Sequence, residues 1–150
     1  MRPALIDLAG ATWVGQGNGR DCYLHPLDPG LVLKVPRADR QARQQNRLEL
    51  LYLTSLMRRG VPFDHIPQMH GLAETTLGTG LVCERIADPD GRGCLSLMET
   101  ARRGGLGRER IEALLEDLLA YLLRHWIVFV DTGGGNLVWQ RGAEGGGRLV

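Results

Sequence analysis

The sequence predicts an α+β fold, because its strands and helices fall into separate blocks. Short strands with one inserted helix occupy residues 11–87, helices follow as far as residue 126, and a strand–turn–strand ends the chain. A parallel sheet would instead need strands and helices that alternate along the chain. With 150 residues, the chain is long enough for one domain with a hydrophobic core and too short to expect two.

Five strands are predicted in the N-terminal half, from short apolar runs that turn residues separate. The segment ATWVGQGNGRDCYLHP (11–26) is typical of two strands joined by a glycine turn, and GLVLKVP (30–36) of a third. IPQMHGLAET (66–75) and GLVCERIA (80–87) have the same pattern, and the turn TLGTG connects them.

Two long helices are predicted where apolar residues recur at steps of three and four. The first covers 38–59, and Gly60 follows it as a stop signal. Its recurring residues are Leu48, Leu51, Tyr52, Leu56 and Met57. The second covers 108–126 and has one apolar stripe, formed by Ile111, Leu114, Leu115, Leu118, Leu119, Leu122 and Trp126. A shorter helical segment, LSLMETARRG (95–104), lies between them.

The C-terminal region is predicted to contain three short strands. IVFV (127–130) is the first and NLVWQ (136–140) the second, and RLV (148–150) begins the third after the turn RGAEGGG. The last apolar run stops at Val150, as expected for a chain that is cut within a hairpin.

The composition predicts a cytoplasmic protein without a polyanionic partner. The formal net charge is only +1, so the charge gives no sign of a nucleic acid as partner. The N-terminus is too interrupted for a signal peptide, and no apolar run reaches the roughly 18 residues of a membrane span. Cys22, Cys83 and Cys94 lack the spacing of a zinc site and are expected to be reduced thiols.

The glycine turn VGQGNGR is the first candidate for chemistry. Glycines at Gly15, Gly17 and Gly19 would let backbone N–H groups approach the oxygens of a phosphate closely. No helix follows the turn, which argues against a dinucleotide-binding turn and against a P-loop. A plain hairpin turn is the alternative.

Lys34 and Glu49 are the next candidates. Lys34 lies inside LVLKV, where alternation places it on the face of Val32 and opposite Leu33 and Val35. It is either a lysine on an exposed edge strand or a cation that reaches phosphates beneath the glycine turn. Glu49 borders the apolar face of the first helix, where a carboxylate usually has a partner. An exposed helix glutamate is the alternative.

The segment FVDTGGGNLVW (129–139) places Asp131 and Asn136 at the two ends of a triple-glycine loop. An aspartate can accept a proton from a substrate hydroxyl, and an asparagine oxygen can bind Mg²⁺. Asp, Gly and Asn also form tight turns, so a capped turn is the alternative.

Each of these features is ambiguous alone, but their order along the chain is specific. A glycine hairpin, a strand lysine, a helix glutamate, two strands, a long helix and an aspartate–asparagine pair follow one another. This order resembles the protein-kinase-like fold, in which these parts bind ATP and form the catalytic loop.

More narrowly, the sequence is similar to the YrbL family, small bacterial kinase-like proteins linked with the PhoP regulatory network. The similarity covers nearly the whole chain. The segments that carry it are CYLHPLDPGLVLKV, RLELLYL, HGLAETTLGTGLVCERIADPDG and YLLRHWIVFVD. ET-x2-GTG and IAD-x-DG are its most specific parts.

The resemblance implies a role in ATP binding for the candidates of the N-terminal half. Gly15, Gly17 and Gly19 would form the loop that covers the phosphates. Lys34 would hold the α- and β-phosphates, and Glu49 would orient Lys34.

The resemblance also implies an adenine slot and a catalytic loop. Cys83 would lie at the back of the slot, and Glu84 to Ile86 would form the hinge, with backbone groups toward the adenine edge. Asp131 would be the base or would orient the substrate hydroxyl, and Asn136 would be a Mg²⁺ ligand. The chain would be a single kinase-like domain, with an antiparallel N-lobe at 1–86, a hinge at about 84–88 and a partial C-lobe at 89–150.

Four departures from the kinase pattern accompany the resemblance. Arg20 occupies the position of the third glycine, and Phe129 and Val130 replace the histidine and arginine before the catalytic aspartate. Gly133 replaces a lysine that stabilises charge on the transferring phosphate. The Asp-Phe-Gly segment, whose aspartate holds Mg²⁺, would come just after GGGRLV, where the sequence ends.

These departures leave three hypotheses about function. The first is an ATP-binding phosphotransferase that moves the γ-phosphate of Mg²⁺·ATP to an unidentified hydroxyl. The second is a catalytically inactive, pseudokinase-like regulatory module. Gly133 in place of a lysine, and the missing Asp-Phe-Gly aspartate, favour this second hypothesis for these residues. The third is a structural fragment without a site. We expect a truncated C-lobe whose apolar surface a partner or a second copy of the chain covers.

Overall fold

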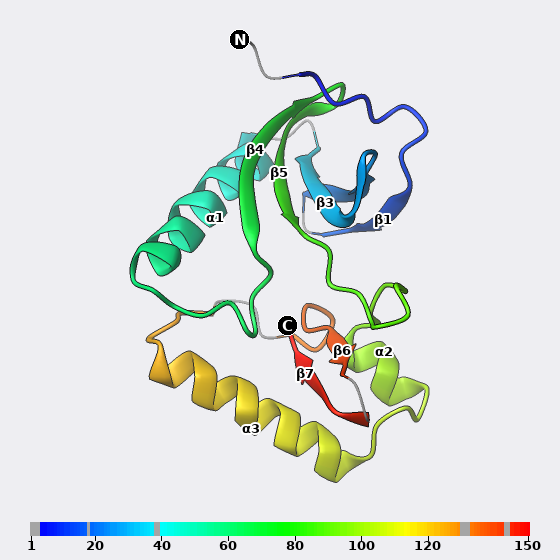
Figure 1. Ribbon diagram of the computed structural model, residues 1–150, viewed down its shortest axis with the longest axis vertical. Helices are drawn as coiled ribbons and strands as arrows, with labels where there is room; N and C mark the ends of the chain where they lie inside the picture. Colours follow the sequence, from blue (N-terminus) through cyan, green and yellow to red (C-terminus); the bar gives the residue numbers. More distant parts are fainter. Residues whose placement is uncertain (1–3, 18, 38–39, 130–132, 143–144) are drawn as a thin grey trace. The chain divides into compact units, whose positions relative to one another are not determined.

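The computed structural model describes residues 4–17, 19–37, 40–129, 133–142 and 145–150 (Figure 1). The chain divides into two compact units. The first consists of Met1–Pro62 and Pro67–Arg85, and the second of Phe63–Ile66 and Ile86–Val150.

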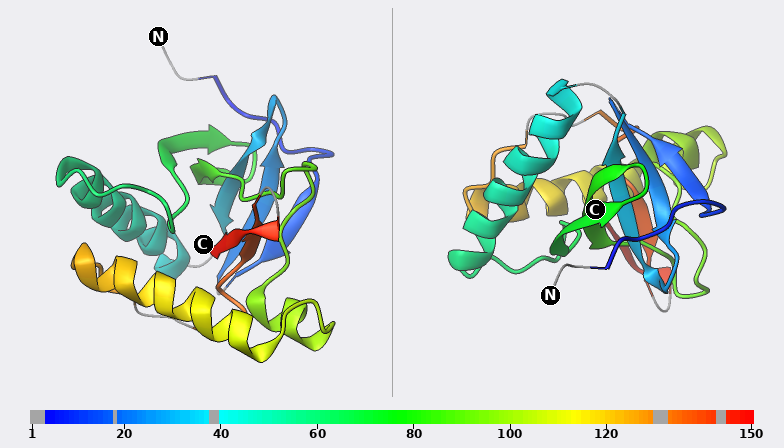
Figure 2. Two further views of the ribbon diagram at one scale, coloured as in Figure 1. Left: turned by 60° about the horizontal axis from the view of Figure 1, so that its bottom comes forward. Right: turned by 90° about the horizontal axis from the view of Figure 1, so that it is seen from above.

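The first unit contains a five-stranded antiparallel sheet with the strand order β1-β2-β3-β5-β4. Its strands are β1 (Trp13–Gln16), β2 (Arg20–His25), β3 (Asp28–Pro36), β4 (Met69–Thr75) and β5 (Gly78–Glu84). One helix, α1 (Arg40–Arg58), packs against β3, β4 and β5 (Figure 2). All five strands and the helix predicted for this half are therefore confirmed, and the fold class is α+β.

The two faces of this sheet differ in character. One face carries a hydrophobic cluster of Leu33, Val35 and Val82, which the N-terminal segment covers with Leu8. That segment is fixed to the sheet by the hydrogen bond from the Leu8 N–H to the Thr76 hydroxyl. Because side chains alternate along a strand, Lys34 lies on the other face, the one toward α1.

The face of α1 that is buried agrees only in part with the apolar stripe that the sequence predicts. Leu56 is buried as predicted, but Leu48, Leu51 and Met57 are more than half exposed. The buried face instead includes the polar Asn46 and the partly buried Glu49, which a pattern of apolar residues does not indicate. The position of the helix is right, and the predicted apolar face is wrong at these three residues.

The second unit is built from two helices and a hairpin. Its elements are α2 (Leu97–Arg102), α3 (Arg108–Arg124), β6 (Trp139–Arg141) and β7 (Gly147–Leu149). Ser96 caps α2, because its hydroxyl accepts the N–H of Glu99. Helix α3 packs against β7 and buries Leu114, Leu118 and Tyr121. These helices and the hairpin agree with the prediction, but the buried stripe of α3 is narrower.

The prediction of a strand at IVFV (127–130) is wrong for the part that the structure describes. Trp126 has a φ of 52°, so the chain turns sharply after α3, and 127–129 form no strand. The predicted strand at 136–140 begins only at Trp139. Its first residues pair instead with the segment before α2, where the Leu97 N–H donates to the carbonyl of Leu137.

No helix in the described part of the chain is long and apolar enough to cross a membrane.

Candidate functional site

Lys34 lies on a central strand of the sheet in the first unit. Strand β3 has β2 on one side and β5 on the other, so the interpretation of Lys34 as an edge-strand lysine is wrong. Cys22 pairs with Lys34 across β2, and Leu81 pairs with it across β5. Cys83, which pairs with Val32, shares the same face. The side chain of Lys34 therefore has a leucine and two thiols as neighbours on its own face of the sheet.

Glu49 on α1 holds two cations with its two carboxylate oxygens. The Lys34 Nζ lies 2.6 Å from Oε1, and a terminal nitrogen of Arg20 lies 2.5 Å from Oε2. The side chain of Glu49 is 25% exposed, so the pair is partly desolvated. Two positive charges and one negative charge leave an excess of +1 in this cluster, which we call the Glu49 cluster (Arg20, Lys34, Asn46 and Glu49).

Asn46 connects this cluster to the backbone of the sheet. It is 3% exposed, and its Oδ1 accepts a hydrogen bond from Arg20 at 3.0 Å. Its Nδ2 donates to the carbonyl oxygens of Lys34, at 2.9 Å, and of Thr79, at 3.4 Å. Asn46 lies about one turn before Glu49 on α1, so both face the sheet. These bonds fix α1 to β3 and β5.

The sequence predictions did not include Asn46, and they treated Arg20 only as a departure from the glycine pattern. The structure gives Arg20 a position at Glu49 instead. The one available signal was a polar residue that lies one turn from Glu49 on the same helical face.

The Glu49 carboxyl is held in its ionised form. Burial alone would raise its pKa, but the charges of Lys34 and Arg20 and their hydrogen bonds outweigh burial, so the pKa is lowered. The two thiols on this face behave in the opposite way. Burial raises the pKa of Cys22, and it raises that of Cys83 to about 11, in spite of the charge of Lys34. Both thiols are therefore neutral at physiological pH.

The glycine hairpin between β1 and β2 has open space beside Gly15, whereas the backbone groups of Gly17 are bonded within the protein. A side chain at Gly15 would meet no atom within 4 Å. Gly19 has a φ of 81°, which favours glycine, and the Gly17 N–H donates to the carbonyl of Arg20. Arg37 also contacts this hairpin. Its guanidinium donates a hydrogen bond to the Gly17 carbonyl at 2.9 Å.

The predicted adenine slot and hinge are placed at the end of β5. Cys83 is buried, and Glu84 ends the strand. The N–H of Glu84 donates to Gln68 and that of Arg85 to Gly30, so the fold itself uses these two amide donors. Ile86 is partly buried and belongs to the second unit.

The predicted catalytic loop is only partly described. Asp131 lies outside the described residues. Asn136 is exposed in a turn, where its N–H donates to the carbonyl of Gly133 at 2.8 Å. The structure thus brings Lys34 and Glu49 together, whereas the grouping of Asp131 and Asn136 with them stays a prediction.

The choice of lysine at position 34 is unusual for this chain. Lys34 is the only lysine among the 18 lysine and arginine residues of the sequence. An ammonium group is a compact charge with three donors, whereas a guanidinium is a wide planar fork. A chain that otherwise uses arginine therefore carries the compact cation at the centre of a sheet, against a helix carboxylate.

Comparison with known proteins identifies relatives along almost the whole chain. Residues 6–150 match the family model described as PhoP regulatory network protein YrbL. The uncharacterized protein YrbL of Escherichia coli K12 is 33% identical over 144 residues, which covers 93% of this chain and 68% of that protein. The uncharacterized protein YrbL of Shigella flexneri matches with the same identity and coverage. The chain belongs to the YrbL family.

Proposed function

We propose that this chain is a kinase-like nucleotide-binding protein whose first unit holds the phosphates of Mg²⁺·ATP. The observation that carries the proposal is the Lys34–Glu49 pair at 2.6 Å on a central strand. Lys34 has three N–H donors, and one of them is bonded to Glu49 in the described part of the chain. The others are available to phosphate oxygens.

The surroundings of Lys34 suit an anionic ligand with an apolar part. The Glu49 cluster has an excess positive charge, and the glycine hairpin between β1 and β2 has open space at Gly15. Val32, Cys22 and Cys83 share the sheet face with Lys34 and are apolar or neutral. A phosphate would lie at Lys34, and a base would lie against the neutral residues.

The candidate residues have distinct tasks in this proposal. Glu49 holds the ammonium of Lys34 in place, and Arg20 occupies the second oxygen of Glu49 so that the carboxylate cannot swing away. The exposed Asn136 would offer its side-chain oxygen to Mg²⁺, and Asp131 would orient the acceptor hydroxyl. ATP supplies the phosphoryl group, and Mg²⁺ neutralises its charge.

A regulatory module without catalysis is the second candidate. Gly133 is the specific observation in its favour, because it leaves the loop without the cation that the resemblance expects. Release or transfer of phosphate that Asp131→Ala abolishes, with nucleotide binding retained, would support the phosphotransferase. Nucleotide binding without any turnover would support the regulatory module.

The single lysine allows a direct test of the proposed site. An acyl-phosphate derivative of ATP transfers its acyl group to an amine that lies beside the bound phosphates. We expect mass spectrometry to find the label on Lys34, and excess Mg²⁺·ATP to suppress it. Mg²⁺·ATP should also raise the melting temperature of the wild type and of Arg110→Ala, but not of Lys34→Ala.

This test can also fail clearly. Labelling of Lys34 that excess ATP leaves unchanged would show a reactive amine without a nucleotide site. If Mg²⁺·ATP raised the melting temperatures of the wild type and of Lys34→Ala equally, the nucleotide would bind at a site that does not include Lys34. Either result would contradict the proposal.

A further inference from the structure

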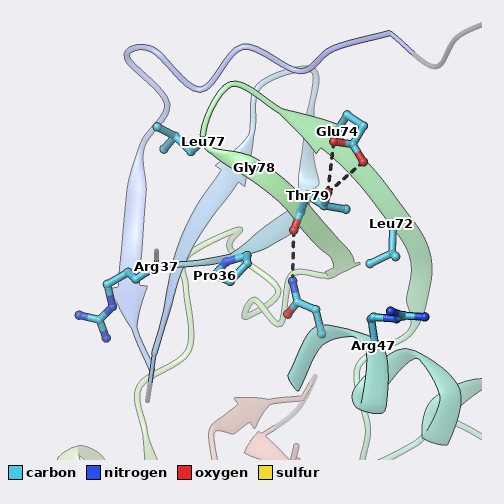
Figure 3. A pocket seen from close by; sticks show the side chains of 9 residues that line it. Pro36, Arg37, Arg47, Leu72, Glu74, Leu77, Gly78 and Thr79 are labelled. Carbon is cyan, nitrogen blue, oxygen red and sulfur yellow. Dashed lines mark hydrogen bonds between the residues drawn. The ribbon is translucent and has the colours of Figure 1, made fainter. Parts of the chain in front are cut away.

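A cavity lies in the first unit, on the same sheet face as Lys34 but toward the first residues of β5. It has a volume of about 710 Å³, within the usual range of ligand pockets. We call it the α1–β4 pocket; the residues that matter here are Arg37, Asn46, Arg47, Leu72, Leu77 and Thr79. Figure 3 shows Arg37 and Arg47 on opposite sides of it, with Leu72 and Leu77 at its rim.

The lining of this pocket combines two cations with exposed apolar side chains. Leu72 is 44% exposed and Leu77 is 54% exposed. Arg47 has no ion pair or hydrogen bond within the part of the chain that the structure describes. Among the described residues, the guanidinium of Arg37 is bonded to a neutral carbonyl, that of Gly17. Neither guanidinium is therefore neutralised by a described carboxylate.

The acidic side chain in the pocket is already engaged. The Glu74 carboxylate accepts the hydroxyl of Thr79, which lies 2.9 Å from Oε1 and 3.2 Å from Oε2 (Figure 3). The pocket thus keeps an excess of positive charge. An acidic ligand would complement it.

We propose that the α1–β4 pocket is a docking site for an acidic peptide segment of a partner protein. Apolar side chains of the segment lie against Leu72 and Leu77, which Figure 3 shows on opposite sides of the pocket, and its carboxylates pair with Arg47 and Arg37. A free phosphate would use the arginines and leave the leucines exposed, so the peptide fits the lining better. This inference does not depend on nucleotide binding, although Asn46 connects the pocket to Lys34.

The test starts from a random peptide library displayed on phage and selected on the full chain. We expect the enriched peptides to carry Asp or Glu beside an apolar residue. Their affinity, measured by fluorescence anisotropy, should fall about tenfold or more in Arg47→Glu, which corresponds to roughly 1.4 kcal/mol. Arg47→Lys should retain most of the affinity, because a charge on the rim matters more than its shape. Arg110→Glu, the same charge change on α3, should have no effect.

Three outcomes would overturn the proposal. The first is a selection that enriches no acidic peptide, and the second is equal binding of the enriched peptides to the wild type and Arg47→Glu. The third is that inorganic phosphate binds, that Arg47→Glu abolishes this binding, and that no acidic peptide is enriched. This result would assign the pocket to a small anion. Because Arg47 is exposed, its substitution should leave the melting temperature close to that of the wild type.

Discussion

The two units each contain a cluster of charges, and the clusters differ in their charge balance. In the first unit, one carboxylate, Glu49, lies between two cations. In the second, Arg141 lies between Asp88 at 2.6 Å and Asp90 at 3.0 Å, and Asp90 also lies 3.9 Å from Arg92. The first cluster has an excess of positive charge, whereas two carboxylates and two guanidiniums balance in the second.

The Asp88 cluster (Asp88, Asp90, Arg92, Cys94 and Arg141) has the features of a structural connection. Asp88 accepts the backbone N–H of Arg141 at 2.8 Å and the thiol of Cys94 at 3.3 Å, besides the guanidinium. Burial alone would raise the pKa of Asp88, but these hydrogen bonds outweigh it and the pKa is lowered. The carboxylate oxygens are used within the protein, and they join the segment after Ile86 to β6.

The Glu49 cluster differs from the Asp88 cluster in the polar groups that it leaves for a ligand. Both oxygens of its carboxylate are bonded, yet Lys34 has further N–H donors without a partner among the described residues, and the cluster retains a positive charge. An ion cluster that only stabilised the fold would gain from neutrality. The imbalance in the first unit therefore suits a ligand, and the closed set of bonds in the second suits a fixed loop.

Of the substitutions that test this comparison, Glu49→Gln should have the largest effect on the stability of the protein. The substitution leaves Lys34 and Arg20 together without a counter-charge on a partly buried face. We expect a loss of about 1–3 kcal/mol in the free energy of unfolding, less than for a fully buried pair because Glu49 is a quarter exposed. Urea denaturation measures it.

The matched control is Glu74→Gln, in the same unit. Its carboxylate is exposed and accepts only the Thr79 hydroxyl among the described residues, so we expect a loss within about 0.5 kcal/mol. Equal losses in the two variants would mean that the Glu49 cluster does not contribute to stability through its charges.

A smaller effect should appear in the pH dependence of stability. The pKa of Glu49 is lowered from a usual value of 4.5, so its contribution is complete above that value and is lost as the pH falls through the folded pKa. The stability difference between the wild type and Glu49→Gln should be constant from about pH 7 to about pH 5, and should shrink below that. Asp88 titrates equally in both proteins and cancels. A difference that grew toward acid pH would show that Glu49 is not held ionised.

The sequence predicted the fold of the first unit well because its signals are local. Glycine turns and alternating apolar residues lie within each strand, so β1 to β5 could be recognised without long-range information. The buried stripe of α1 could not, because it depends on which helix face meets the sheet. Asn46 and Glu49 on that face are polar, and their partners Arg20 and Lys34 lie elsewhere in the sequence.

The site itself was only partly accessible to sequence reasoning. The pairing of Lys34 with Glu49 was expected from the resemblance, since alternation shows the face of Lys34 but not its partner. The contacts between Asp88 and Arg141 span 53 residues and follow no local pattern. The α1–β4 pocket was likewise unpredictable, because it depends on the packing of α1 against the ends of β3, β4 and β5.

The smallest effect on nucleotide binding should come from Asp88→Asn in the second unit. Asparagine retains an acceptor for the Arg141 amide but loses the charge that holds its guanidinium, so the segment at Asp88 should open more often. Hydrogen exchange should become several-fold faster at the Arg141 amide and stay unchanged at the amides of β3 and β5. The thermal stabilisation by Mg²⁺·ATP should be the same as in the wild type, because in the proposal its phosphates are held by Lys34 and the glycine hairpin. If Asp88→Asn reduced that stabilisation as much as Lys34→Ala, the Asp88 cluster would belong to the binding site, and the assignment of one cluster to the ligand and the other to the fold would be wrong.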